Sequence, residues 1–316
     1  MERPPITVLA GGVGAARFLL GVVGLVSPSE VTVIGNVGDD IVFGGLHVSP
    51  DLDTVLYTLT NAIDEERGWG TRGDSARALG RSRELGFDAW FWLGDLDIGL
   101  HLARTSWLHG GTPLSEVTAR LAAAMGLGAQ LLPCTDDRLR TMIRTADGEL
   151  EFQDYFVRRG HRDPVLGIRF DGADIASPAP GVIEALKGAR AILLAPSNPL
   201  ISIAPILAVR AVREALEQRT VPCIAVSPIV AGAAIKGPAA EMLHSLGHDA
   251  SPVGVVDLYA GLIDAMVIDV ADSDHAAAIE ARGVAAVVTD TIMRDAETRI
   301  NLASAALRAA GIAEIV

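Results

Sequence analysis

The chain has 316 residues, of which 50% are hydrophobic, and a formal net charge of −13. A chain of this length can form one large domain or two coupled ones with a sizeable core. The acidic balance argues against nucleic acid and anionic membrane surfaces as partners, because both attract basic patches.

Short apolar runs separated by helical patterns predict the strands of a parallel sheet. The strand-like runs are Ile6–Ala10, Val31–Ile34, Ala191–Ala195, Val221–Val226, Met266–Ile268 and Val284–Val288. Helical patterns fall between them, for example at Gly181–Lys187 and Ala204–Gln218. Near-continuous apolar strands that alternate with helices are typical of a doubly wound, mostly parallel α/β sheet of the Rossmann type, covered on both faces.

The middle of the chain, residues 65–160, is richer in aromatic residues and poorer in strand-like runs. It contains a well-marked helix that Thr112 can cap and that Gly126 ends. We predict a nucleotide-binding core formed by residues 1–64 and 161–316, with 65–160 inserted over the carboxyl ends of the strands. The insert is interpreted as an acceptor-binding region or lid, and a simple structural extension is the alternative.

Cellular location is predicted from the cysteines and from the start of the chain. Cys134 and Cys223 lie far apart, each near an apolar run, which is typical of buried reduced thiols, and no zinc-ligand spacing is present. MERPPI runs straight into a strand-like stretch, so we expect no signal peptide. No apolar run of about 18 residues lacks a charge or a turn signal, so we expect no membrane span. Together these features predict a cytoplasmic protein.

Four polar loops follow strand-like runs. They are Gly11–Ala16, Asn36–Asp40 (NVGDD), Ser197–Ser202 (SNPLIS) and Ser227–Gly237 (SPIVAGAAIKG). In an open parallel sheet, ligands bind beyond the carboxyl ends of the strands. Any one of these loops could be an ordinary turn, but four together predict a shared ligand-binding crevice.

The first of these loops has the pattern of a phosphate cradle. Gly11, Gly12 and Gly14 let the backbone approach an anion, and the helix that follows offers N–H groups and the positive end of its dipole. Arg17 stands where a dinucleotide fingerprint has its third glycine, and no G-K-[ST] follows. The loop therefore predicts phosphate binding and disfavours an NAD-dependent oxidoreductase.

Two acidic pairs are candidates for chemistry. Asp51 and Asp53 follow Pro50 at the start of a helical pattern, where they could cap the helix or bind Mg²⁺ together with phosphate oxygens. Asp95 and Asp97 follow the aromatic run WFWL. They suit a polar rim around a flat ring, or equally a turn at the end of a buried strand.

Taken in order, these stretches resemble the 2-phospho-L-lactate transferase family of coenzyme F-420 biosynthesis, including its actinobacterial phosphoenolpyruvate transferases. The resemblance rests on AGGVGAARFLLGV, NVGDD, SPDLDTVLYTL, RGWG, WFWLGDLD, LLPCTDDR, FQDYFVRR, LLAPSNPLISIAPIL, SPIVAGAAIKGPA and VTDTIM, which together cover nearly the whole chain. SPDLDT and the PSNP segment are specific in combination, whereas the glycine loop alone is not.

The resemblance implies a reaction. A phosphorylated three-carbon acid, phosphoenolpyruvate or 2-phospho-L-lactate, would pass from its guanosine diphosphate ester to the ribityl hydroxyl of 7,8-didemethyl-8-hydroxy-5-deazariboflavin, and GMP would leave. Such a transfer needs positioning and charge neutralisation, which Mg²⁺, backbone N–H groups and one lysine would supply. The resemblance also implies a homodimer. It leaves the identity of the acid open, since no residue can be assigned to that end of the donor.

The resemblance also implies roles for individual residues. The guanosine and its phosphates would be held by Gly11, Gly12, Gly14, Asn36, Ser197, Asn198, Ser227 and Lys236. Asp53 matches a deazaflavin-binding aspartate of the family. We expect Asp53 and Asp51 to be the catalytic residues, one of them orienting the attacking hydroxyl, and to be the metal ligands as well.

Two departures from the family pattern concern the deazaflavin side. Trp92 stands where some relatives have a lysine, so stacking would replace a charged contact. GDLDIGLH replaces the usual G-D-[RK]-D and A-T-H, with Leu96 in place of a base and His101 kept. We expect Trp92 and Asp95 to contact the deazaflavin.

A non-catalytic regulator is the alternative function. Proteins that resemble the gluconeogenesis factor have a similar sheet and glycine loop, and are thought to bind a nucleotide-sugar without turnover. SPDLDT and the aromatic insert favour the transferase, because a pure nucleotide binder needs neither feature.

Overall fold

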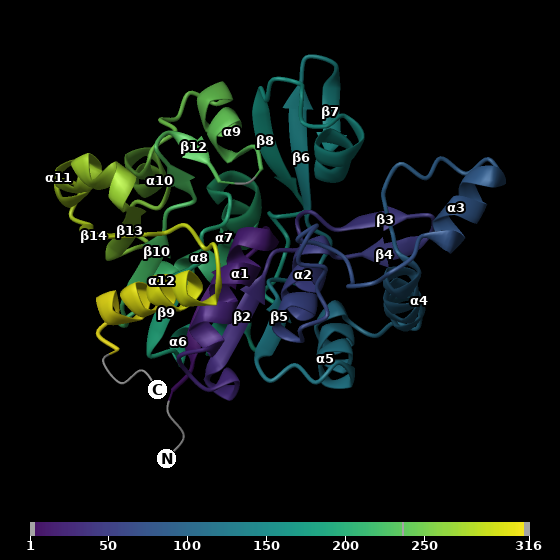
Figure 1. Cartoon of the computed structure of the whole chain (residues 1–316), viewed down its shortest axis with the longest axis horizontal. Coiled ribbons are helices and arrows are strands. Elements are labelled where there is room, and N and C mark those ends of the chain that lie inside the picture. Colours follow the sequence, from purple (N-terminus) through teal and green to yellow (C-terminus); the bar gives the residue numbers. More distant parts are fainter. Residues whose placement is uncertain (1–3, 236, 313–316) are drawn as a thin grey trace.

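The computed structural model describes residues 4–235 and 237–312. The strands of its central sheet are β1 Ile6–Ala10, β2 Val31–Gly35, β5 Gln130–Pro133, β9 Ala191–Leu194, β10 Cys223–Val226, β13 Ala265–Asp269 and β14 Ala285–Thr289. Their order is β14-β13-β10-β9-β1-β2-β5, and every neighbouring pair is parallel (Figure 1). The predicted Rossmann-like α/β fold is confirmed.

Helices cover both faces of this sheet, as strands that are buried along their whole length require. On the face turned to the viewer in Figure 1, α1 (Gly12–Val23) packs against α2 (Pro50–Leu59) and α12 (Ala296–Ala309). On the other face, α8 (Arg210–Glu217) packs against α6 (Val182–Lys187). The two faces follow from right-handed crossovers that run in opposite directions from the middle of the sheet.

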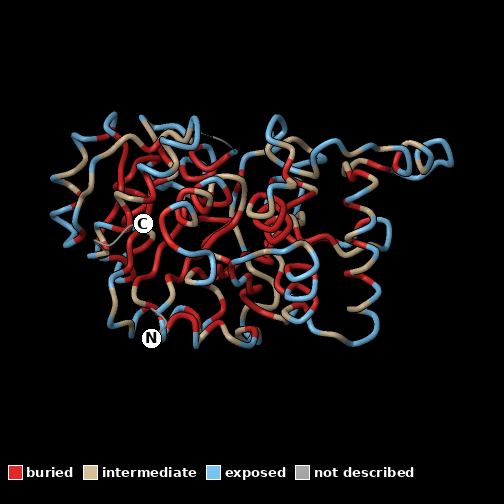
Figure 2. The backbone as a smooth tube through the Cα atoms, turned by 60° about the horizontal axis from the view of Figure 1, so that its bottom comes forward, coloured by how far each residue is buried: buried red, intermediate tan, exposed pale blue. Residues whose placement is uncertain are grey.

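Smaller elements flank the central sheet. They are η1 Pro28–Glu30, β3 Ile41–Phe43, β4 Leu46–Val48, α3 Arg77–Glu84, α4 Asp95–His109, α5 Leu114–Ala124, β6 Arg140–Thr145, β7 Gly148–Glu151, η2 Asp154–Arg158, β8 Gly167–Asp171, η3 Pro199–Ile203, α7 Ala204–Ala208, β11 Ile229–Val230, β12 Ala233–Ala234, α9 Ala239–Ser245, α10 Pro252–Leu258, η4 Val270–His275 and α11 Ala276–Glu280. The β3–β4 hairpin, α3 and the start of α4 form a satellite lobe with a small apolar core of its own. Figure 2 shows that buried residues concentrate around the central sheet, whereas the arm that carries α3 is largely exposed. Within the described residues, the helices are too short or too polar to span a bilayer.

Several predicted boundaries differ from the structure. The helix expected over Ala204–Gln218 is interrupted at Val209, whose ψ of 101° turns the chain so that α7 and α8 both bury apolar side chains. The strand expected from Val221 begins at Cys223. The helix that Thr112 was expected to cap begins at Leu114, without a side-chain cap, and the left-handed Gly126 follows its end as predicted.

The segment 65–160 is only in part an addition to the sheet. It supplies α3 and α4 of the satellite lobe, but it also supplies β5, which pairs with β2 at the edge of the central sheet. The proposed division into a core of 1–64 and 161–316 and an insert of 65–160 stays a prediction. In the structure, the insert and the core share one sheet and one main hydrophobic core.

Candidate functional site

The order of the strands reverses between β1 and β9, because the chain continues from β1 to β2 on one side and from β9 to β10 on the other. In open α/β sheets, ligands bind at the carboxyl ends of the strands at such a point. The loops after β1 and β9 touch there. The Ser197 hydroxyl donates to the Gly11 carbonyl oxygen at 2.8 Å, and the Gly11 N–H donates to the Ser197 hydroxyl oxygen at 3.2 Å.

A cavity of about 760 Å³ lies at this edge of the sheet. From the predicted site, its lining includes Gly11, Gly12, Gly14, Asp51, Asp53, Trp92, Ser197, Asn198 and Ser227. Asn36 and Asp95 are not part of the lining, and Lys236 lies outside the described residues. The cavity has a polar wall around Gly11–Gly14 and Asp51, here called the glycine-loop side. It also has a wall of Trp69 and Trp90–Trp92, here called the aromatic side.

The three glycines of the first loop have different roles. Gly12 has a φ of +76°, and a Cβ built on it would meet no atom within 4 Å. A Cβ on Gly11 would lie 2.7 Å from Asp51 Oδ2, and one on Gly14 would lie 2.6 Å from the carbonyl oxygen of Pro196. Gly11 and Gly14 therefore allow the loop to close against its neighbours, whereas Gly12 borders open space.

We expect Gly14→Ala to lower the free energy of unfolding by about 1–3 kcal/mol, because the new Cβ must push the backbone at Pro196 away. Gly99→Ala is the matched control, since Gly99 lies in α4 with no atom near a built Cβ. Alanine favours a helix over glycine by about 1 kcal/mol, so this control should be neutral or stabilising. Urea unfolding measures both variants, and equal stabilities would contradict the packing role of Gly14.

Asp51 lies at the start of α2 and holds the first turn of α1. The Gly12 N–H donates to Asp51 Oδ1 at 2.8 Å, and Asn36 Nδ2 donates to Asp51 Oδ2 at 2.8 Å. Burial raises the pKa of Asp51 to about 6, although both hydrogen bonds work to lower it. Asn36 also donates to the Ile201 carbonyl oxygen at 3.2 Å. It therefore positions Asp51, and it is not part of the cavity lining, although it was predicted to hold the guanosine and its phosphates.

Asp39, which was not predicted from the sequence as a site residue, is a further carboxylate in the cavity wall. It is buried, and its Oδ1 has no hydrogen-bond partner. Burial, reinforced by the charge of Asp51, raises the pKa of Asp39 well above its ordinary value. Among residues 4–235 and 237–312, no three His, Cys, Asp or Glu side chains form a group that could hold a metal ion. A cation at Asp39 and Asp51 would therefore need ligands from phosphate or water.

Asp53 is bound on both carboxylate oxygens by Arg104, a residue that was not predicted from the sequence either. Arg104 Nη1 donates to Asp53 Oδ2 at 3.0 Å, and Nη2 donates to Oδ1. Both side chains are buried, with only 1% of Arg104 exposed. Burial works to lower the pKa of Arg104, but the charge and hydrogen bonds of Asp53 raise it overall. An arginine three residues after His101 in a helical pattern is the signal that could have found this pair.

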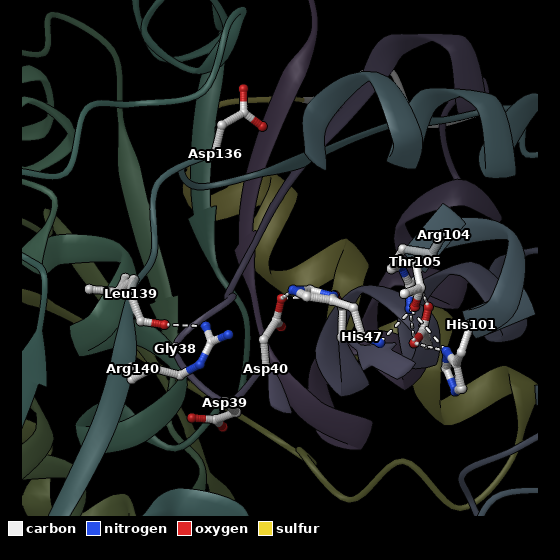
Figure 3. Close-up of polar contacts among 12 residues, drawn as sticks. Gly38, Asp39, Asp40, His47, His101, Arg104, Thr105, Asp136, Leu139 and Arg140 are labelled. Carbon is white, nitrogen blue, oxygen red and sulfur yellow. Dashed lines mark hydrogen bonds and ion pairs between the residues drawn. The ribbon is translucent and has the colours of Figure 1, made fainter. Parts of the chain in front are cut away.

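Arg104 also contacts His101, which lines the cavity. Figure 3 shows the two side chains facing each other, and Arg104 Nη1 lies 3.1 Å from His101 Nδ1. His101 is 2% exposed. Burial, assisted by the charge of Arg104, lowers the pKa of His101 to about 4, although Asp53 opposes this shift. The imidazole is therefore neutral near pH 7.

A second buried polar cluster fixes the loop that follows β2. The Ser49 hydroxyl donates to Asp40 Oδ2 at 2.8 Å, and His47 Nε2 lies 3.6 Å from the same oxygen (Figure 3). Burial raises the pKa of Asp40 to about 7, and burial lowers that of His47 to about 4. These contacts connect the loop to the residues just before α2, and so hold Asp39 beside the start of that helix.

The aromatic side is built from rings that meet at their edges. Trp69 and Trp92 have ring centroids 5.1 Å apart and planes at 73°. The Arg67 guanidinium lies 4.5 Å from the centroid of the Trp92 ring, so it covers one face of that ring. Asp95, predicted to contact the deazaflavin, lies outside the cavity lining. Its carboxylate accepts hydrogen bonds from backbone N–H groups at the start of α3, including that of Ala78 at 3.0 Å.

Comparison with known protein families matches residues 6–307 to the family described as 2-phospho-L-lactate transferase CofD. This chain belongs to the CofD family. The phosphoenolpyruvate transferase of Kitasatospora aureofaciens is 43% identical, over 96% of this chain and 96% of its own. That of Streptomyces coelicolor is 41% identical, over 96% of this chain and 97% of its own. A 2-phospho-L-lactate transferase of Methanosarcina acetivorans is 38% identical, over 94% of this chain and 96% of its own. The predicted family is confirmed.

Solved structures confirm the fold of this CofD-family chain. A crystal structure of a UPF0052-family protein from Bacillus halodurans has a TM-score of 0.66 at 16% sequence identity. The match covers 97% of this chain and 99% of that protein. At this identity the likeness concerns the arrangement of the elements and not the activity.

Proposed function

We propose that this CofD-family transferase acts in coenzyme F-420 biosynthesis. It moves a phosphorylated three-carbon acid, phosphoenolpyruvate or 2-phospho-L-lactate, from the guanosine diphosphate ester of that acid to the ribityl hydroxyl of 7,8-didemethyl-8-hydroxy-5-deazariboflavin. GMP is the leaving group. The observation that carries the proposal is one cavity that joins a glycine loop at a helix N-terminus to an aromatic wall. The family match and the names of the relatives support the reaction class.

The two sides of the cavity suit the two substrates. On the glycine-loop side, the first turn of α1 leaves backbone N–H groups without helical partners, and these attract phosphate oxygens. On the aromatic side, indole and phenyl rings offer flat apolar surface to a fused ring such as a deazaflavin. The attacking hydroxyl sits on a flexible ribityl chain, which would reach from the aromatic side toward the phosphorus.

Mg²⁺ is part of this proposal because Asp51 occupies the same helix N-terminus that would receive phosphate. Two anions in contact repel each other, and a divalent cation shared by them removes the repulsion. Asp51 and the partnerless oxygen of Asp39 suit that cation. Asp53, expected from the sequence as a ligand, has both oxygens engaged by Arg104. When bound, the metal would neutralise charge on the diphosphate.

A turnover assay tests the proposed function. The chain is incubated with Mg²⁺, the deazaflavin and, in turn, the guanylylated esters of phosphoenolpyruvate, 2-phospho-L-lactate and phosphoglycerate. We expect GMP release and a product of the corresponding mass with one or more donors. Tight binding of a nucleotide-sugar with no GMP release from any donor would favour the regulator instead. The homodimer and the cytoplasmic location stay predictions.

Trp92→Ala should weaken deazaflavin binding by about tenfold, because the aromatic side loses contact area worth about 1.4 kcal/mol. Affinity for GDP should stay unchanged. Trp107→Ala is the matched control, since Trp107 is also half-buried beneath an arginine, Arg120, but lies outside the cavity lining. Fluorescence titration of both variants measures the difference. If the Trp92 variant binds the deazaflavin as tightly as the Trp107 variant, Trp92 only packs against the apolar core of the satellite lobe and does not contact the deazaflavin.

A further inference from the structure

The contact between Arg104 and His101 determines which imidazole nitrogen carries the proton. An arginine side chain has only donors and stays charged in proteins. Arg104 Nη1 is 3.1 Å from His101 Nδ1, so its N–H needs an acceptor there, and Nδ1 must be unprotonated. In a neutral imidazole the proton then lies on Nε2. Asp53 fixes Arg104 in this position through a two-pronged pair, which limits any alternative orientation.

Within residues 4–235 and 237–312, the Nε2–H group of His101 has no acceptor. Every recorded hydrogen bond and ion pair of this side chain within the described residues is made through Nδ1. The side chain is 2% exposed, yet it forms part of the cavity wall. An N–H group on the cavity wall can donate to an oxygen of a bound ligand.

A second polar group of the cavity wall lies nearby on α2. The Tyr57 hydroxyl is buried there, and burial together with the charges of Asp53 and Asp97 raises its pKa. Tyr57 lies one helical turn after Asp53 on α2, and His101 lies one helical turn before Arg104 on α4. Two donors on neighbouring helices thus flank one buried ion pair.

The position of His101 along the cavity favours the ring of the acceptor over its ribityl chain. Asp97 lies one helical turn before His101 on α4. A Cβ on Gly70 would lie 3.4 Å from Trp92 and 3.6 Å from Asp97, so this turn of α4 adjoins the aromatic side. The ribityl chain must extend the other way, toward the phosphates at the glycine loop. A deazaflavin ring offers carbonyl oxygens on its pyrimidinedione edge, and these accept hydrogen bonds.

We infer that His101 is a specificity-determining residue for the acceptor, donating from Nε2–H to a carbonyl oxygen of the deazaflavin ring, and that Arg104 is the positioning residue that fixes this tautomer. The inference rests on the proposed function, because it assigns the acceptor to the aromatic side. The same donor would reject a ring that presents an N–H at this point, since two donors would then face each other.

Three variants and two ligands test the inference. The ligands are the full deazaflavin and its 10-methyl analogue, which keeps the ring but lacks the ribityl hydroxyls. We expect His101→Leu to weaken the binding of both by about tenfold, or 1.4 kcal/mol. His101→Gln should stay within about threefold of the unmodified chain, because its amide N–H can take the place of Nε2–H. His109→Leu, an exposed histidine at the end of the same helix, is the control and should change neither affinity.

The outcomes separate the inference from the function it rests on. If His101→Leu binds both ligands as tightly as the unmodified chain, or loses affinity for the full deazaflavin only, the contact with the ring is overturned. The proposed function would still stand. A chain that binds neither ligand overturns the proposed function and the inference together. GDP affinity, measured by calorimetry, should be the same in all variants.

The tautomer of His101 can be measured directly in the unmodified chain. With [¹⁵N]histidine incorporated, the nitrogen chemical shifts distinguish a protonated from an unprotonated ring nitrogen. His101→Gln identifies which of the seven histidine signals belongs to His101. We expect protonated Nε2 and unprotonated Nδ1 at neutral pH. Protonation at Nδ1 would overturn the positioning role of Arg104.

Discussion

Arg104→Met should lower the free energy of unfolding by about 3–5 kcal/mol, because it leaves the buried Asp53 carboxylate without its partner. Asp53→Leu should be comparably harmful, since it leaves the Arg104 guanidinium buried and unpaired. The double variant Asp53→Leu/Arg104→Met should recover most of the loss, because apolar side chains of similar volume avoid the desolvation of both charges. Denaturant unfolding of the three proteins measures the coupling between the two positions.

An exposed ion pair provides the control for this experiment. Arg213 and Glu217 lie four residues apart on α8, with an N–O distance of 2.9 Å, and about half of each side chain is exposed. Arg213→Met should change the free energy of unfolding by less than about 1 kcal/mol, since solvent screens such pairs. If Arg104→Met lowers the free energy of unfolding no more than Arg213→Met does, the buried Asp53–Arg104 pair does not stabilise the fold.

Removal of Mg²⁺ is expected to have the largest effect on the proposed reaction. Chelation with EDTA should lower GDP affinity at least about tenfold and the transfer rate roughly 100-fold or more, because phosphate would then meet the Asp51 carboxylate without a cation. Added Mg²⁺ should restore both. Asp51→Asn removes the charge at nearly constant shape, so its GDP affinity should depend much less on Mg²⁺, and its loss of rate should appear mainly in kcat.

Asp95→Asn is the matched control for the metal experiment. Asp95 is also an aspartate in the first turn of a helix, but its carboxylate faces the start of α3 and lies outside the cavity lining. This variant should keep the Mg²⁺ dependence of the unmodified chain. Full turnover in EDTA, or an unchanged response to Mg²⁺ in Asp51→Asn, would refute the metal site.

The sequence by itself determined six of the seven strands of the central sheet, and the family. Strands such as Ile6–Ala10 are buried on both faces, so each needs a continuous apolar run, and such a run is visible without any structure. The glycine loop is visible as well, because its position between a strand and a helix is a local property. The motifs that identify the family are contiguous stretches, and their order along the chain was sufficient to assign it.

Only the tertiary structure decided what the polar residues of the site do. Asp53 and Arg104 are 51 positions apart, and their pairing depends on how α2 and α4 meet. Asn36 contacts Asp51 and lies outside the cavity lining because of the path of its loop, and Asp95 binds the start of α3 because the satellite lobe folds back on α4. Gln130–Pro133 became a sheet strand by pairing with β2. Periodicity and composition predict the helix or strand to which a residue belongs. They do not predict these contacts, because each contact joins two elements that are brought together only by tertiary packing.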